Sequence, residues 1–401
     1  RKVVSSNPMK WASALSAESR LETAVKEAAL SVKKQLDGAV PDFMALFVSR
    51  NFADRYEEAG ALLADRLPGR VVMGTSAAGL IGEGKELESK PGVSLTAAVL
   101  PDVKVHAFSI QEEDLPDLDD SPRAWEKLVG VRATENPQFV LLADPFSFRI
   151  DNFILGLDFA FPKSAKVGGL ASGGSEPGRN ALYLNHLCLR SGLVGVALTG
   201  NIALETVVAQ GCRPIGLPLR VTECNENILI SVNGKPPVEV LQSIFPDLPD
   251  RDRRLMKQAL FVGIAMTSTL DHPAQGDFLI RNILGVNNEN GSLAIGSPLR
   301  PGQTIQFHLR DSHSSTEDLR AVFDRTGEAK TKTRGALLFS CVGRGKSLFG
   351  KANHDTDFFL QNVGPVPLGG FFCNGEIGPV GGTTYVHGYT SCFGLFQPCH
   401  E

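Results

Sequence analysis

Three glycine-containing segments carry the polar groups best placed for chemistry in this 401-residue sequence. Main chain next to glycine can approach a ligand closely, and nearby helix N-termini favour anions. We therefore predict a cleft for a small polar ligand, an amino acid or a small anion. The alternative is that the glycines only allow sheets to pack backbone against backbone. Ten residues are candidate ligand-binding residues: Thr75, Ser76, Gly168, Gly169, Ser172, Arg344, Cys373, Asn374, Glu376 and His387.

The sequence contains only weak candidates for a set of catalytic residues. Cys373 is the best candidate nucleophile, with His387 or His354 as its base, and this arrangement requires spatial adjacency. The pattern G-x-S-x-G is absent around Ser76 and Ser172, so no nucleophile elbow is predicted. No HxH or HxxxH pair supports a metal site, and no cofactor is predicted. The sequence favours a protein that is not an enzyme, with a Cys-dependent hydrolase or transferase as an alternative.

The segment 340–347 resembles a phosphate-binding loop, because it ends in Gly-Lys-Ser. That motif requires a further glycine five positions earlier, where this chain has Ser340. Nucleotide hydrolysis is therefore not predicted here. Arg344 and Lys346 remain candidate anion ligands, and the alternative is a basic turn in solvent.

A strand, a helix and a glycine-ended strand occur in that order three times. This order describes a βαβ crossover, and the apolar segments that follow each copy are expected to form hairpins that extend the sheet antiparallel. The predicted fold is α/β with mixed parallel and antiparallel sheets, built from duplicated βαβ units. The copies cover residues 43–79, 139–174 and 336–376, and the following segments cover 93–110, 193–209 and 383–396.

The domain organisation follows from breaks between these patterns. Residues 1–39 are predicted to be an N-terminal extension and a helix, with Ser16 as its N-cap and Gly38 as its stop. The main boundary is placed at the Gly-Lys-Pro-Pro sequence 234–237, before a helical stretch at 238–244. Two domains, 40–235 and 236–401, result.

Composition excludes several classes of protein. A net charge of −4 and a pI near 6.1 argue against nucleic-acid binding. No apolar run reaches the roughly 18–20 residues of a transmembrane helix. Seven scattered cysteines without a CxxC pair indicate a reducing compartment. Residues 1–17 are basic and serine-rich with no acid, which is typical of a transit-peptide tail, and an arbitrary cut of the chain is the alternative.

Several motifs together resemble the FIST family, a name that stands for F-box and intracellular signal transduction. The segment 369–379, Gly-Gly-Phe-Phe-Cys-Asn-Gly-Glu-Ile-Gly-Pro, followed by His-Gly-Tyr-Thr at 387–390, is similar to the C-terminal signature of FIST domains. The segments 73–82, 168–172 and 210–216 resemble the N-terminal half. The resemblance covers roughly residues 40–395.

The resemblance implies two FIST domains and a sensory module proposed to bind small ligands such as amino acids. The opening 9–16, Met-Lys-Trp-Ala-Ser-Ala-Leu-Ser, looks like the beginning of stand-alone cyanobacterial and plant members without an F-box. That similarity makes residues 1–8 the remnant of a chloroplast extension and predicts a chloroplast protein, with the cytoplasm as the alternative. A competing hypothesis is a scaffold or assembly subunit of a larger plastid complex, which implies a protein partner.

Overall fold

The computed structural model describes residues 8–267 and 272–400, which fold into two compact units. The first unit contains the chain up to Val208 together with Phe323–Val386 and Thr390–Glu401. The second unit contains Ala209–Val322 and His387–Tyr389. The division near residue 208 does not coincide with the boundary expected at 234–237. Residues 1–7, on which most of the expected chloroplast extension falls, lie outside the described residues.

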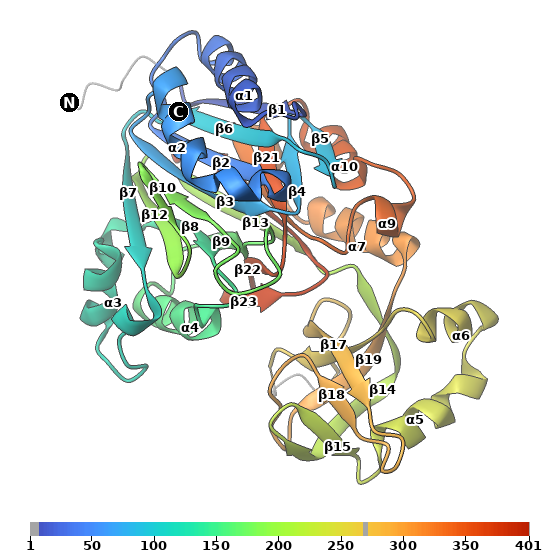
Figure 1. Cartoon of the computed structure of the whole chain (residues 1–401). Coiled ribbons are helices and arrows are strands. Elements are labelled where there is room, and N and C mark those ends of the chain that lie inside the picture. The colour runs from blue at the N-terminus through green and yellow to red at the C-terminus, as the bar shows by residue number, and fades with distance from the viewer. Residues whose placement is uncertain (1–7, 268–271, 401) are drawn as a thin grey trace. The chain divides into compact units, whose positions relative to one another are not determined.

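The first unit contains three six-stranded sheets, and each is built around one βαβ copy (Figure 1). In every copy the two strands pair in parallel, as predicted. Each parallel pair is bordered by an antiparallel strand from the segment that follows the copy. The mixed α/β architecture is therefore confirmed.

The three sheets have the same plan. The first runs in the order β1 (Lys10–Ser16), β6 (Val93–Val99), β2 (Phe43–Ser49), β3 (Val71–Ala77), β10 (Leu182–Leu184) and β11 (Leu187–Leu189). The second runs in the order β7 (Val103–Ile110), β12 (Leu193–Gly200), β8 (Gln138–Ala143), β9 (Lys166–Leu170), β22 (Glu376–Val380) and β23 (Thr383–His387). The third runs in the order β13 (Ala203–Ala209), β24 (Ser391–Gln397), β20 (Gly335–Cys341), β21 (Leu368–Cys373), β4 (Gly79–Gly82) and β5 (Lys85–Glu88).

The copies exchange strands in a cycle. The strand pair that follows each glycine-ended strand joins the sheet of another copy: β4–β5 joins the third copy, β22–β23 joins the second, and β10–β11 joins the first. Each copy therefore supplies the outer strands that another copy needs. This exchange brings the three glycine segments to one place in the first unit.

The hairpins expected after each copy are wrong. β6 pairs with β1 and β2, whereas β7 pairs with β12 in the next sheet. β12 and β13 likewise lie in different sheets, and β24 pairs with β20. The Pro101-Asp102 and Gly200-Asn201 turns are therefore crossings between sheets. A turn sequence alone cannot distinguish a hairpin from a crossing between two sheets, because strand pairing is decided by long-range packing.

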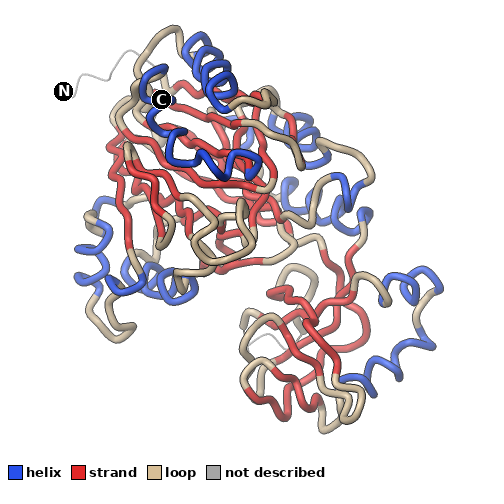
Figure 2. Tube along the Cα trace, viewed as in Figure 1, coloured by secondary structure: helices blue, strands red, loops and turns tan. Residues whose placement is uncertain are grey.

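The inner faces of the three sheets share one apolar core, to which Phe47, Val140 and Phe371 contribute. Helices cover the outer faces of the strands (Figure 2). α1 (Leu21–Gln35) and α2 (Tyr56–Arg66) cover the first sheet, and α3 (Pro122–Val129) and α4 (Ile150–Ala160) cover the second. α10 (His354–Val363) is the crossover helix of the third copy and packs Phe359 against Phe393.

The predicted start of the first helix is wrong. Ser16 is the last residue of strand β1, and its hydroxyl donates to Glu27 Oε2 at 2.7 Å rather than capping a helix. Arg20 occupies the N-cap of α1 and makes no side-chain cap. Polar and apolar residues alternate only weakly along β1, and for this reason the sequence does not predict the strand.

The second unit is a closed six-stranded barrel that the sequence did not predict. Its strands run in the order β14 (Cys212–Asn225), β15 (Ile228–Val232), β18 (Leu293–Ile295), β17 (Phe278–Val286), β16 (Leu260–Ala265) and β19 (Thr304–Arg310). Val262 and Phe307 are buried in its core. The helix expected at 238–244 is confirmed as α5 (Pro237–Ile244), and α6 (Asp250–Met256) follows it. α7 (Ser312–Asp324) leads the chain out of this unit.

Candidate functional site

The three glycine segments meet through direct hydrogen bonds. Ser172 Oγ, at the end of the second segment, donates to the carbonyl of Phe372 in the third. The same oxygen accepts from Ala78 N of the first segment at 2.9 Å. Asn374 Nδ2 donates to the carbonyl of Ala171 at 3.2 Å. Ser172 is thus the point at which all three copies are connected.

Close packing explains why glycine is needed at this junction. A Cβ on Gly168 would lie 1.8 Å from the carbonyl oxygen of Leu141, and one on Gly169 would lie 2.4 Å from Cys373 Sγ. Neither distance is compatible with a side chain. At these two positions the bare main chain is in contact with neighbouring strands.

The hydroxyl groups of the first segment are also engaged inside the protein. Thr75 Oγ1 donates to the carbonyl of Ala181 at 2.9 Å. Ser76 Oγ donates to Asn180 Oδ1 at 3.1 Å, and Asn180 Nδ2 donates to the buried carboxylate of Asp144 at 3.1 Å. Asp144 directly follows strand β8, so its position at the carboxyl end of a parallel strand was a signal that sequence reasoning missed.

A buried charge cluster lies at the carboxyl ends of β20 and β21. Arg344, in the turn after β20, donates from Nε to Asp355 Oδ2 at 2.8 Å and from Nη2 to Oδ1 at 2.9 Å. Ser391 Oγ donates to Asp355 Oδ2 at 2.5 Å. Arg344 is completely buried and Asp355 is 2% exposed. We call Arg344, Asp355, Ser391 and the nearby Glu376 the buried charge cluster.

The cluster keeps Asp355 ionised. Burial opposes the charge, but the Arg344 guanidinium and hydrogen bonds from His354, Arg344 and Ser391 outweigh it, so the pKa of Asp355 lies below its usual range. His354 Nδ1 lies 2.8 Å from Asp355 Oδ1 and its ring stacks on Phe349. The role of Asp355 was not predicted, although its sequence neighbour His354 was considered as a base.

Glu376, in contrast to Asp355, has a raised pKa. The residue is completely buried, and among the described residues neither of its carboxylate oxygens has a hydrogen-bond partner of normal geometry. Burial raises the pKa of Glu376 well above its ordinary value, against the effects of Arg344 and of the nearby Cys341 thiol and Thr390 amide, which lower it. A buried carboxyl group with a perturbed pKa is a marker of functional sites.

Cys373 lacks the features of an activated nucleophile. Burial, and then the neighbouring Glu376, raises the pKa of its thiol well above the usual value. Its Sγ lies 3.4 Å from the carbonyl of Phe371, to which it donates. The thiolate is the reactive form of cysteine, so this environment disfavours nucleophilic chemistry.

The remaining sequence candidates do not belong to the cluster as defined above. Asn374 is exposed, and His387 is a buried residue of the second unit. Lys346 is exposed, and its backbone N–H donates to Glu88 Oε2 at 3.0 Å. Because the Glu88 carboxylate accepts from the Lys346 N–H, this N–H of the loop at 340–347 is not available to a phosphate.

Glu86 is a further perturbed acid that sequence reasoning missed. Its carboxylate accepts from Asn353 N at 2.9 Å and Thr356 N at 3.3 Å, at the beginning of α10. Burial, and then the nearby charge of Asp355, raises the pKa of Glu86 to about 7. Strand β5 is thereby connected to the helix that carries Asp355.

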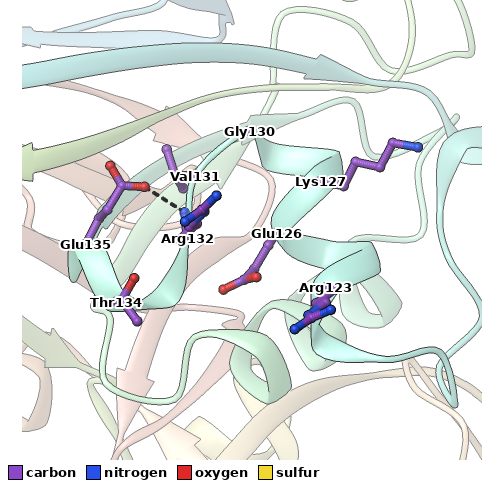
Figure 3. Close-up of a pocket in the computed structure, with 8 residues that line it drawn as sticks. All are labelled: Arg123, Glu126, Lys127, Gly130, Val131, Arg132, Thr134 and Glu135. Carbon is purple, nitrogen blue, oxygen red and sulfur yellow. Dashed lines mark hydrogen bonds between the residues drawn. The ribbon is translucent and has the colours of Figure 1, made fainter.

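The described residues also line cavities away from the cluster. One of about 760 Å³ lies beside α3, where Figure 3 shows Glu126 between Arg123 and the turn that carries Thr134 and Glu135. Both carboxylates are engaged, because Glu126 Oε1 accepts from Ala133 N at 2.8 Å and Glu135 Oε2 accepts from Arg132 N at 2.9 Å. Arg123, Lys127 and Arg132 are exposed surface cations, Thr134 is exposed and Val131 is buried, so this pocket is a weak candidate.

Two smaller cavities lie elsewhere, one in each unit. One of about 510 Å³ lies beside α10 in the first unit, and one of about 480 Å³ lies beside β15 and β17 in the second. Within residues 8–267 and 272–400, no three His, Cys, Asp or Glu side chains converge as a metal site. None of the helices described here has the length and apolar character that a bilayer span requires.

Comparison with known proteins identifies the family. The FIST N domain matches residues 42–235, and the FIST C domain matches residues 237–379. An uncharacterized protein of Mycobacterium tuberculosis is 34% identical over 376 residues, which is 93% of this chain and 96% of that relative. An uncharacterized protein of Mycobacterium bovis is 34% identical over 378 residues, 93% of this chain and 95% of the relative.

A plant protein is more distantly similar. An F-box/LRR-repeat protein of Arabidopsis thaliana is 23% identical over 325 residues, which is 71% of this chain and 61% of that relative. The two domain matches and the relatives that align over nearly their whole length show that this chain belongs to the FIST family, whose domains are sensory domains of signal transduction.

Proposed function

We propose that this chain is a sensory module that binds a small polar ligand without transforming it, at the buried charge cluster. The observation that carries the proposal is Glu376, a completely buried carboxyl group whose pKa is raised by burial and whose two oxygens have no hydrogen-bond partner of normal geometry among the described residues. A buried carboxylate whose hydrogen bonds are poor is costly. A ligand that donates to Glu376 removes this cost, and this gain favours the bound state.

The charges around Glu376 indicate the chemistry of the ligand. Arg344 already shares its positive charge with Asp355 through two hydrogen bonds. An added anion would place a further negative charge beside two carboxyl groups, whereas an ammonium group would pair with Glu376. The cluster therefore favours an amino acid over a small anion as the ligand.

A function without catalysis is supported by the state of the thiols. Burial raises the pKa of Cys373, and it raises that of Cys392 as well. His354, the base considered for Cys373, is instead bonded to Asp355. A hydrolase that uses Cys373 has no support in this geometry.

A ligand screen tests the proposal. Calorimetric titration and thermal shift are measured with the twenty L-amino acids, and with acetate and phosphate as anions. We expect at least one amino acid to bind wild type and to bind Glu376→Gln at least tenfold more weakly, while the exposed acid Glu205 gives a control, Glu205→Gln, with unchanged binding. Binding of anions alone, or amino-acid binding that is equal in both variants, would contradict it.

A scaffold function is a second candidate, supported by an apolar stripe on α4. Leu155 and Phe159 are one helical turn apart and are 58% and 56% exposed. Exposed apolar side chains that gather on one face mark protein contacts. A partner that co-purifies stoichiometrically with wild type and is lost from Leu155→Ser/Phe159→Ser would support this function, and retention of the partner would exclude α4 as the contact. The chloroplast location stays a prediction, and the relatives at 34% identity are mycobacterial.

A further inference from the structure

A cavity beside helix α10 has the size of a small-molecule site and is separate from the buried charge cluster. Its volume is about 510 Å³, and none of Arg344, Asp355 or Glu376 lines it. Ligand sites typically measure roughly 300–1,000 Å³. Figure 1 shows α10 beside β5, and the turn between β4 and β5 forms the opposite side of the cavity.

One wall of the cavity is apolar. Leu360 on α10 is 46% exposed, although it is a large apolar side chain. The chain after the helix adds Pro365, Val366 and Pro367 to the same wall. This wall offers an apolar molecule a continuous surface, and the two prolines hold their main chain in a fixed conformation.

The rim of the cavity is charged. Glu83 comes from the turn between β4 and β5, Lys85 is the first residue of β5, and Asp357 comes from the first turn of α10. All three are exposed. Two carboxylates therefore face one ammonium group around the opening, which favours a cationic head group over an anionic one.

Hydrogen bonds hold the elements around the cavity in place. Ser13 Oγ donates to the carbonyl of Leu368 at 2.8 Å and accepts from Glu83 N at 3.2 Å. Asn353 Oδ1 accepts from Glu86 N at 2.7 Å, and Asn353 N donates back to Glu86. Asn353 has a left-handed backbone with φ of +66°, a conformation that asparagine adopts more readily than most residues. A preformed site of this kind loses little entropy when a ligand binds.

We propose that this cavity is a second ligand site, which takes a small amphipathic amine. The apolar body of the ligand lies against Leu360 and the wall at 365–367, and its ammonium group lies at the rim near Glu83 and Asp357. The site uses none of the residues of the buried charge cluster, so it stands or falls separately from the function proposed there.

The test uses 3-phenylpropylamine as the probe and 3-phenylpropionate as its anionic counterpart. Each is titrated into the full chain with methyl-labelled Leu and Val, and NMR shifts are followed. We expect the amine to shift the methyl signals of Leu360, Val366 and Leu368, with a dissociation constant on the order of 1 mM for a ligand of this size. The propionate should bind at least about threefold more weakly, given the charges at the rim.

Matched variants separate the wall from the rim. Leu360→Arg should abolish the shifts at Val366, and Asp357→Asn should weaken the amine about threefold, as expected for one exposed charge. Lys85→Gln should strengthen it. Leu155→Arg and Asp151→Asn, which change an exposed leucine and an exposed aspartate on α4, are the controls and should bind like wild type.

Three outcomes overturn the proposal: equal binding of amine and propionate, shifts that are absent from the three named methyl groups, or undiminished binding by folded Leu360→Arg. Because Asp357 is exposed, Asp357→Asn tests the rim even if Leu360→Arg does not fold. Loss of amino-acid binding in Glu376→Gln with normal binding of 3-phenylpropylamine would show that the two sites are separate.

Discussion

Arg344 and Asp355 form an ion pair with two hydrogen bonds, of 2.8 and 2.9 Å, inside the first unit. Neither side chain is more than 2% exposed. The pair joins the turn after β20 to the first turn of α10. It holds two charges in a region that also contains the carboxyl group of Glu376, and Arg344 lowers the pKa of both acids. The arrangement of this site therefore depends on Arg344.

The pair itself gives the first prediction. Asp355→Asn removes the charge that balances buried Arg344, and we expect it to lower the free energy of unfolding by about 3–5 kcal/mol. Urea denaturation measures this loss. Glu112→Gln, which breaks the exposed pair with Arg149, is the control and should cost less than about 1 kcal/mol. Similar losses in both variants would show that the buried pair has no special role in stability.

Removing the charge of Glu376 should stabilise the chain in the absence of ligand. Because the pKa of Glu376 is raised in the folded state, the stability it contributes is present at low pH and is lost as pH rises. Glu376→Gln does not titrate, so its melting temperature should exceed that of wild type at pH 8. The difference should shrink toward pH 4. A lower melting temperature than wild type at pH 8 would contradict a costly carboxylate at this position.

Glu86 gives a pH dependence with a defined window. Its pKa rises from 4.5 to about 7 on folding, so the stability it contributes is full below pH 4.5 and is lost as pH rises through 7. The free energy of unfolding of wild type minus that of Glu86→Gln should fall by at most about 3 kcal/mol between pH 4.5 and 8. Glu83→Gln, which changes an exposed acid in the turn before β5, is the control. A difference that stays constant across this range would refute the raised pKa.

The junction of the three copies should be intolerant of small changes. Gly168→Ala places a Cβ against the carbonyl of Leu141 and should strongly destabilise the chain, whereas Gly285→Ala, where no atom lies within 4 Å of the added Cβ, should have little effect. Ser172→Ala leaves Ala78 N and the Phe372 carbonyl without their shared partner. We expect this loss to lower the free energy of unfolding by about 1–3 kcal/mol. Thermal unfolding measures all three, and equal melting temperatures for the two glycine variants would contradict the packed junction.

Thiol labelling tests the state of the cysteines. At pH 7.5, iodoacetamide should modify Cys399, which is exposed, and should spare buried Cys373 and Cys392, whose pKa values are raised. Mass spectrometry of peptides from the native chain gives the extent of labelling at each position. Rapid modification of Cys373 would revive a nucleophilic role.

Local patterns in the sequence predict the copies but not their assembly. Each βαβ copy is visible because apolar strands, a helix and glycine follow one another within about 40 residues. The exchange of β4–β5, β10–β11 and β22–β23 between sheets depends on pairing over long separations, as in the contact of Ser172 with Phe372. Short-range patterns carry no record of such pairing.

The candidate site was predicted only in part, because local sequence patterns do not show which residues meet in space. Arg344 and Glu376 were selected because they follow strands of a repeated unit, and the structure places both in the first unit with their charges interacting. Asp355 was missed as the partner of Arg344, because the two lie 11 positions apart and turn and helix intervene. His387 was selected by the same reasoning but belongs to the second unit.

Proton release on binding tests the account most directly. If the raised pKa keeps Glu376 protonated in the empty site and the carboxylate pairs with a ligand ammonium, then binding of the amino acid at pH 7 releases protons, up to one per ligand. Calorimetric titration in buffers of different ionisation enthalpy measures that number. We predict net proton release when wild type binds the ligand and none when Glu376→Gln binds it, with weaker binding in the variant. Equal affinity and no proton release in either protein would contradict ligand binding at Glu376.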